Sequence, residues 1–440
     1  GHWRDEVGRS APQGVRRLMG TAITLDVSDV SIAYAKNHMG IDFGHLFQPE
    51  DETRRKSEAI NYDYYEEHPE EKDELVVHEA AFVRPLSRVL PRLLLFGSSI
   101  ESARFEYEAI IAEAREMATY MEPPEETGFL TFEEYCALVG RYRLSSLGGG
   151  TEFDDKEKAK GRLVADKDFD RLPWTENSDN FWSESSFFAA KLAILSPESM
   201  LHVFALNPDN LDAEVKWEFG PLVVSGWASR EDFAPGARRM QKILIATEGA
   251  SDARIIKRTL DILRPDVADF FNFVDVDERH HFWGTGNLVK FAEGLLRIDV
   301  QNKVLFVFDN DAEGVEAYRK LNALKLPSNM RSMLLPDLDD FQSFPTLGPE
   351  GVGVSDINGR AAAIECYLDL NLPSYGPAQV LWSNYKRAID AWHGALEFKE
   401  SYQRHFYDQA PEALLSGCYD VSKLLKIVDA LIVEASLVSS

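Results

Sequence analysis

The sequence predicts an α/β fold built on a parallel sheet, preceded by an α+β unit and followed by a helical segment. Residues 243–247 and 303–308 are short, mostly apolar runs, which are typical of central strands buried on both faces. Each run ends in acidic residues and continues through a glycine into a helical pattern. The alternation from residue 241 onward predicts the following elements: strands at 243–247, 270–276, 303–308 and 330–335, and helices at 251–264, 286–298 and 312–324.

Acidic residues stand at the tips of both expected central strands. Glu248 follows the first strand, and Asp309 and Asp311 follow the later one. Because open α/β sheets bind ligands at the carboxyl ends of their strands, we expect these carboxylates to converge to roughly 4–8 Å. Such a group repels itself unless a hard divalent cation neutralises it. The pattern therefore predicts a metal site.

These residues resemble a known domain. Glu248-Gly249, followed at a similar distance by Asp309-x-Asp311, is similar to the Toprim domain of topoisomerases, primases and OLD-type nucleases. Asp252 matches the second acid of the E-G-x-x-D version of that motif. The resemblance implies a Rossmann-like Toprim domain over residues 240–370.

Residues further along the chain resemble the OLD-like branch of this family. The IECYL stretch at 364–368 is similar to the "IE-x-YL" helix of that branch, whose glutamate corresponds to Glu365. Residues 284–287 (GTGN) resemble the glycine-rich turn that opens its second helix, and Lys399 resembles the lysine that follows its acids. The segment TAITLDVSDVSIAYAKN through GHLFQPED, within residues 21–51, resembles the region ahead of Toprim in HEPN/Toprim-associated proteins of prokaryotic conflict systems.

The resemblance also implies roles for these residues. The implied metal ligands are Glu248, Asp252, Asp309, Asp311 and Glu365, and the implied catalytic residues are Glu248, Asp309, Asp311, Glu365 and Lys399. The implied cofactor is Mg²⁺, with Mn²⁺ as a substitute. Mg²⁺ binds through a few carboxylates, and the sequence has no Cys/His set that would bind zinc instead. The glutamate acts either as a general acid or base or as a second-metal ligand, and the lysine stabilises transition-state charge.

The N-terminal half predicts an α+β domain over residues 20–235, associated with HEPN/Toprim proteins by the same resemblance. Residues 21–35 alternate as two strands joined at Ser28-Asp29, and the pattern from Leu75 to Met121 is helical. Thr131-x-x-Glu134 resembles a capping box, and the glycine triplet within residues 146–160 is a linker candidate. We interpret the many aromatic residues between 163 and 240 as core rather than as base-stacking residues, because few basic residues are interleaved. A helical extension is expected over residues 371–440.

Composition limits the possible classes of protein. The 440 residues suffice for two or three domains, and a net charge of −26 disfavours non-specific duplex binding, so nucleic acid needs a local basic patch, a metal or a partner. The three cysteines show no metal-ligand spacing, and no run reaches membrane-spanning length, which together indicate a cytoplasmic protein. We interpret residues 1–19 as a leader or an expression remnant, since Met19 is the more natural start.

One further pattern concerns Arg387 and His393, which satisfy the R-x(4–6)-H spacing of HEPN ribonucleases. About two such pairs are expected by chance in a chain of this composition, so we expect changes at either residue to matter much less than changes at the acids. His280-His281 is interpreted as an exposed loop pair rather than a phosphate contact.

Two functions remain after these observations. No tyrosine-bearing topoisomerase domain, no zinc module and no G-x-x-x-x-G-K-[ST] loop is visible, so an ATPase or sensor, if needed, is a separate subunit. The first function is a metal-dependent nuclease acting on DNA or RNA, tRNA included, as the effector of an anti-phage defence system and within an oligomer or complex. The second is a catalytically inactive Toprim fold that serves as a binding or regulatory subunit.

Overall fold

The computed structural model describes most of the chain, namely residues 20–57, 60–120, 128–150, 155–274 and 285–439. Two compact units divide it. Unit 1 comprises Gly1–Leu90 and Ser98–Gly236, and unit 2 comprises Pro91–Gly97 and Ala237–Ser440. Unit 2 is therefore discontinuous in sequence.

Unit 1 contains a five-stranded antiparallel sheet with the order β2-β1-β5-β4-β3. Its strands are β1 (Ala22–Val27), β2 (Val30–Lys36), β3 (Glu52–Arg54), β4 (Ala80–Pro85) and β5 (Glu214–Trp217). The predicted hairpin is confirmed, with Val27 opposite Val30 and Ser28 in the left-handed region at φ 52°. The predicted uninterrupted helical pattern from Leu75 is wrong at β4, because AAFVRP packs as a buried strand between β3 and β5.

Helices and aromatic side chains complete unit 1. The helices are α1 (Tyr62–Glu67), α2 (Lys72–His78), α3 (Leu86–Phe96, which continues into unit 2), α4 (Ile100–Thr119), α5 (Phe132–Gly140), α6 (Lys156–Ala159), α7 (Glu184–Leu192), α8 (Pro197–Phe204) and α9 (Gly220–Val224). Trp217 of β5 is 1% exposed and contacts the rings of Phe47, Phe82 and Phe233. The interpretation of this aromatic set as core is confirmed for five of its members, namely Phe181, Phe187, Phe188, Trp217 and Phe219. It is wrong for Trp174, Trp182 and Trp227, which are exposed.

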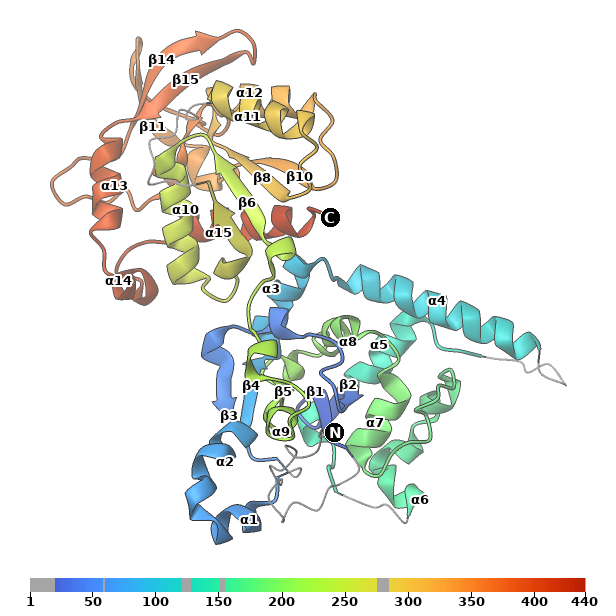
Figure 1. The fold of residues 1–440 in the computed structure, drawn as a ribbon. Helices are drawn as coiled ribbons and strands as arrows, with labels where there is room; N and C mark the ends of the chain where they lie inside the picture. Colours follow the sequence, from blue (N-terminus) through green and yellow to red (C-terminus); the bar gives the residue numbers. More distant parts are fainter. Residues whose placement is uncertain (1–19, 58–59, 121–127, 151–154, 275–284, 440) are drawn as a thin grey trace, which may run out of the picture. The chain divides into compact units, whose positions relative to one another are not determined.

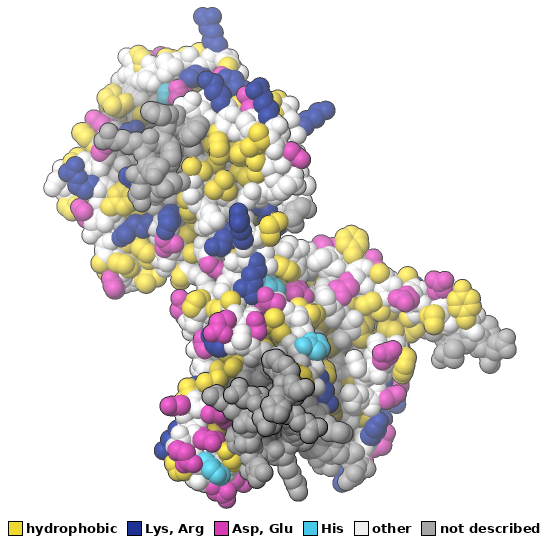
Figure 2. Space-filling view, viewed as in Figure 1, with side chains coloured by type: hydrophobic (Ala, Val, Ile, Leu, Met, Phe, Trp, Pro, Cys, Tyr) yellow, Lys and Arg dark blue, Asp and Glu magenta, His cyan; other side chains and the backbone are white. Residues whose placement is uncertain are grey.

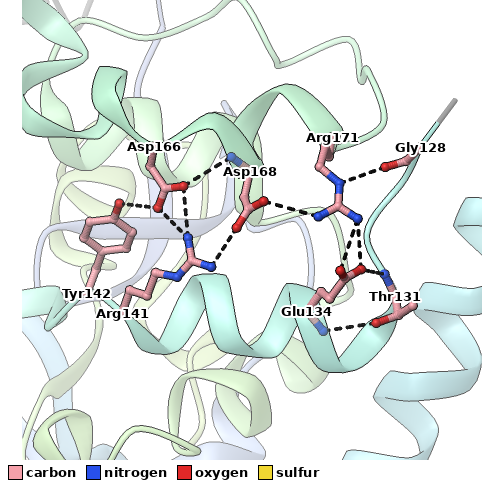
Figure 3. A network of polar contacts seen from close by, with 8 residues as sticks. All are labelled: Gly128, Thr131, Glu134, Arg141, Tyr142, Asp166, Asp168 and Arg171. Carbon is pink, nitrogen blue, oxygen red and sulfur yellow. Dashed lines mark hydrogen bonds and ion pairs between the residues drawn. The ribbon is translucent and has the colours of Figure 1, made fainter.

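A polar network fixes α5 against the segment that follows the glycine triplet (Figure 3). Thr131 and Glu134 form the predicted capping box at the start of α5. Beyond its end, Arg141 contacts Asp166 and Asp168 at 2.9 and 2.6 Å. The triplet itself is tied to α7, because the Gly148 amide donates to the Glu184 carboxylate at 2.8 Å. The linker candidate therefore lies inside unit 1 and does not separate the two units.

Unit 2 is built on a four-stranded parallel sheet with the order β10-β8-β6-β7 (Figure 1). Its strands are β6 (Ile243–Thr247), β7 (Phe271–Phe273), β8 (Lys303–Phe308) and β10 (Met330–Leu334), and its flanking helices are α10 (Ala250–Leu263), α11 (Thr285–Arg297), α12 (Ala312–Asn322) and α15 (Ser422–Ser436). These strands and the first three helices confirm the alternation predicted from the sequence. Alternate residues of β6 serve the two faces, since Ile245 packs in the core with α10 and α15, and Ala246 in the core with α11 and α12.

The strand order places a topological switch between β6 and β8. From β6 the chain moves through α10 to β7 on one side, and later strands add on the other side at β8 and β10. Helices that leave neighbouring strands toward opposite faces open a crevice at the carboxyl ends of those strands, which is where ligands bind in open α/β sheets. Glu248 and Asp309 follow the two strands at this switch.

The C-terminal part of unit 2 carries a second sheet, with the order β12-β11-β14-β15. Its strands are β11 (Phe344–Gly348), β12 (Gly351–Ser355), β14 (Val380–Lys386) and β15 (Ala391–Leu396), and the remaining helices are α13 (Lys399–Tyr407) and α14 (Pro411–Ser416). The predicted helical segment over 371–440 is therefore wrong for residues 380–396. A short ladder, β9 (Asn310–Asp311) with β13 (Ala361–Ala362), joins the acids to this region.

Charge is distributed unevenly between the units. Unit 1 has 44 acidic and 24 basic residues, whereas unit 2 has 29 and 23, so most of the net charge of −26 belongs to unit 1. Figure 2 shows Lys and Arg side chains spread over the visible face of unit 2. Among the described helices, none is long and apolar enough by itself to span a membrane, and α7 with α8 pass that test only as a pair bent by 114°.

Candidate metal and catalytic site

Glu248 and Asp309 meet at the carboxyl edge of the parallel sheet. β6 and β8 are hydrogen-bonded neighbours with Thr247 opposite Val307, so the residues that follow them emerge side by side. The backbone amide of Asp309 donates to Glu248 Oε1 at 3.0 Å. The Glu248 carboxylate thus lies along the sheet edge toward β8 and not in the apolar core.

The first turn of α12 approaches this edge closely, and Gly314 makes the approach possible. A Cβ atom at Gly314 would lie 2.1 Å from the Asp309 carbonyl oxygen and 2.9 Å from Glu248 Oε1, well inside contact distance. The Gly314 amide donates to Asp311 Oδ1 at 2.7 Å, so Asp311 caps the helix. The start of α12 is therefore packed closely against Glu248 and Asp309.

A segment distant in sequence completes the cluster. Asp311 pairs with Ala361 across the β9–β13 ladder, and the Ile364 amide donates to Asp309 Oδ1 at 2.9 Å. Ile364 opens a 3₁₀ turn, η12 (Ile364–Tyr367), which carries the buried Glu365. The expected IE-x-YL helix is therefore only a single 3₁₀ turn in this chain.

The acids act on one another electrostatically. Burial, then the charges of Asp311 and Asp252, raise the pKa of Glu248 to about 9. Burial, then the charge of Glu365, raise the pKa of Asp252 to about 7. Burial also raises the pKa of Asp309 well above its ordinary value, and Asp252 and Glu248 add to the effect. These groups form a buried cluster of like charges, which a cation would stabilise.

The carboxylates of the cluster do not have the geometry of a metal site. Among the residues that the structure describes, no group of three or more His, Cys, Asp or Glu side chains has the arrangement that holds a metal ion. Backbone amides bind four of the carboxylates instead, namely Glu248, Asp252, Asp309 and Asp311. The donor chemistry nevertheless fits Mg²⁺ or Mn²⁺, which bind carboxylate oxygens, because an amide hydrogen bond to one oxygen of a carboxylate leaves the other oxygen available to a cation.

The comparisons with known proteins concern the other part of the chain. The family model for the HEPN/Toprim N-terminal domain 1 matches residues 19–241. The chain belongs to this family. The match ends two residues before β6, so all the acids of the cluster lie beyond it. No curated protein and no solved structure matches the chain.

The structure brings five of the predicted site residues together and leaves one apart. Asp252, Asp311, Glu248 and Glu365 all add to the rise that burial causes in the pKa of Asp309, which places these four acids around it. Lys399 is an exposed residue at the start of α13, and that helix meets the cluster through Gln403, whose side-chain amide donates to Glu365 Oε1 at 2.6 Å. His280, His281 and Gly284 lie outside the described residues.

Sequence reasoning missed His393 as a neighbour of the acids. His393 lies on β15; burial raises the pKa of Asp311, and the charge of His393 opposes that rise. Its Nδ1 atom is buried and has no hydrogen-bond partner within the part of the chain that the structure describes. Arg387 is exposed in the turn between β14 and β15, whereas His393 is paired with Asn384 further along the hairpin. Spacing to Arg387 was therefore the wrong criterion for His393, and Gln403 had no sequence signal at all.

Proposed function

We propose that this chain is a metal-dependent nuclease that cleaves phosphodiester bonds in DNA or RNA, tRNA included, and acts in prokaryotic anti-phage defence. The observation that carries the proposal is the buried acid cluster at the topological switch, where Glu248 and Asp309 leave adjacent parallel strands. Burying like charges costs free energy, and a bound cation would offset that cost by neutralising the carboxylates. Membership of the HEPN/Toprim N-terminal family supports the role in defence.

The proposed chemistry assigns tasks to particular side chains. Asp309 and Asp311 hold Mg²⁺ or Mn²⁺, with Asp252 and Glu365 as further oxygen donors, and Glu248 is either another ligand or the general base. A bound ion of this kind polarises the phosphoryl group and lowers the pKa of water. The amides of Asp309, Ile364 and Gly314 orient the carboxylates, and Gln403 orients Glu365.

The test uses the full-length protein with plasmid DNA, single-stranded RNA and total tRNA in Mg²⁺, Mn²⁺ or EDTA. Asp309→Ala and Glu248→Ala should abolish cleavage, because losing metal-assisted catalysis removes several kcal/mol of transition-state stabilisation and lowers the rate by orders of magnitude. Calorimetric titration with Mn²⁺ should show binding to the native protein and not to the Asp309→Ala variant. Glu350→Ala, at an exposed acid between β11 and β12, is the matched control.

Two results would overturn the proposal. Cleavage that persists in EDTA and in the Asp309→Ala variant would exclude the acids as the catalytic centre. Loss of cleavage in Arg387→Ala, with full activity in Asp309→Ala, would instead identify a HEPN-type ribonuclease on a Toprim-like scaffold.

A second candidate function is an inactive binding or regulatory subunit, and one observation favours it. The carboxylates are bound by backbone amides and are not arranged as metal ligands, and their raised pKa values allow them to be protonated without an ion. This function predicts neither Mn²⁺ binding nor cleavage by the native protein, so the same titration separates the two candidates.

A further inference from the structure

The β14–β15 hairpin presents an aromatic pair to solvent. Tyr385 and Trp392 are directly opposite each other across the ladder, and their rings are edge to face with centroids 5.8 Å apart. Their exposed fractions are 45% and 43%, which is high for rings that core packing normally covers. The Tyr385 hydroxyl donates to Asp390 in the turn, so that ring is held in place on the outer face of the hairpin.

The other face of the same hairpin lies against the acid cluster. Side chains alternate across a strand, so Lys386 and His393 point away from the aromatic pair. Lys386 Nζ lies 3.1 Å from Glu313 Oε1 in the first turn of α12, the turn that Asp311 caps. β15 also packs against α12 and against β13, the strand that pairs with Asp311. The hairpin therefore has one face at the acids and one face in solvent.

We infer that the β14–β15 hairpin binds an unpaired nucleic-acid strand whose bases stack on Tyr385 and Trp392, an inference that rests on the proposed function for its class of ligand. Aromatic rings stack on any base, but a duplex keeps the faces of its bases inside its own stack. Arg387 is exposed at the tip between the two faces and supplies positive charge for a phosphate. A strand that turns around this tip has bases on the rings and a phosphate on the side of the acids.

Charge favours unit 2 over unit 1 as the part of the chain where a nucleic-acid strand binds. Unit 2 is close to charge balance apart from its buried acids, whereas unit 1 is strongly acidic and repels phosphates. The strand preference also accounts for nucleic-acid binding by a chain with a net charge of −26, because stacking replaces much of the phosphate contact that duplex binding needs.

The experiment measures binding without cleavage. Fluorescence anisotropy in EDTA follows labelled single-stranded DNA and RNA of about 20 nucleotides, longer than common single-strand sites, and a duplex of equal length. The native protein should bind the single strands more tightly than the duplex. Trp392→Ala and Tyr385→Ala should each raise the Kd for single strands by about 5- to 150-fold, the fold-change equivalent to 1–3 kcal/mol per stacked base.

Matched variants separate stacking from loss of structure. Trp392→Phe and Tyr385→Phe keep a ring and should keep most of the affinity, and Trp174→Ala, at an exposed tryptophan of unit 1, should bind like the native protein. Thermal unfolding checks that each variant is folded. Equal binding by the native protein and both alanine variants, stronger binding to duplex, or no binding to any oligonucleotide would overturn the inference. So would conversion of a native dimer to monomer by Trp392→Ala, because a second copy would then cover the rings.

The two proposals, strand binding by the hairpin and metal-dependent cleavage, can fail separately in these experiments. Ring-dependent binding with no cleavage under any metal condition would support the hairpin and refute the catalytic role. Metal-dependent cleavage with binding unaffected by both alanine variants would refute the hairpin alone.

Discussion

Replacing Glu248 with Gln should stabilise the metal-free protein at pH 8 and change its stability little at pH 5. Gln has the same shape, and its carbonyl oxygen can still accept the hydrogen bond from the Asp309 amide. Burial and the charges of Asp311 and Asp252 raise the pKa of Glu248 from 4.5 to about 9. The native state therefore holds this proton more tightly than the unfolded chain, and the free energy of unfolding falls as the pH rises from 4.5 toward 9.

The magnitude follows from the pH interval. A pH of 8 lies about 3.5 units above the ordinary pKa of a glutamate, so the stabilisation gained by Glu248→Gln is at most about 5 kcal/mol. At pH 5 the same calculation gives less than about 1 kcal/mol. Neighbouring acids take up the shared proton, and the buried amide has its own desolvation cost, so we expect about 2 kcal/mol at pH 8. For a unit of this size that gain raises Tm by about 4–8 °C.

Thermal unfolding followed by circular dichroism in EDTA, from pH 5 to pH 9, measures this difference. Glu350→Gln, at an exposed acid of unit 2, should show no change at any pH. Added Mg²⁺ should stabilise the native protein and reduce the advantage of the variant, because the ion then neutralises the cluster. A variant that is less stable at pH 8, or a gain of equal size at pH 5 and pH 8, would refute the electrostatic reasoning.

Two further predictions concern packing and a buried ion pair in unit 2, both measured by urea unfolding. Gly314→Ala should lower the free energy of unfolding by about 1–3 kcal/mol, because the added methyl group overlaps the Asp309 carbonyl. Gly294→Ala, in open space on α11, should raise it by about 0.5–1 kcal/mol. Equal effects of the two changes would contradict the close approach at Gly314. Arg92→Ala should cost about 3–5 kcal/mol, because fully buried Arg92 binds Asp269 through two hydrogen bonds; a loss below about 1 kcal/mol would contradict this role. Since Arg92 depresses the pKa of Asp269, the contribution of the pair should disappear as the pH falls through that lowered pKa, below 3.8.

The parallel sheet and its acids were predictable because their signals are local. A strand covered on both faces needs a mostly apolar run, and residues 243–247 and 303–308 each have one. The proximity of Glu248 and Asp309 then follows from the rule that parallel strands end at the same edge. Identifying these few residues required no knowledge of the rest of the chain.

The β14–β15 hairpin and the contacts across the cluster were not predictable, because no local sequence pattern specifies them. VLWSNYK and AWHGAL mix aromatic, polar and small residues, and Trp382, Tyr385 and Trp392 suit a helix face as well as a strand. The packing of β15 against β13 and the hydrogen bond from Gln403 to Glu365 join segments distant in sequence, so no local periodicity encodes them. Lys399 was chosen by its place after the acids, and the helix presents a different residue to the cluster.

The discontinuity of unit 2 affects how the protein is synthesised and how it can be dissected. Residues Pro91–Gly97 leave the ribosome about 140 residues before β6, a delay of roughly 7–30 s at ordinary elongation rates. During that time Leu95 and the Arg92 guanidinium lack the core and the carboxylate that bury them in the finished protein. A fragment that starts at residue 237 lacks residues 91–97, so its Asp269 has no Arg92 guanidinium to bind. The half of the molecule that carries the acids can therefore be excised intact only if the sequence PRLLLFG is grafted back onto it.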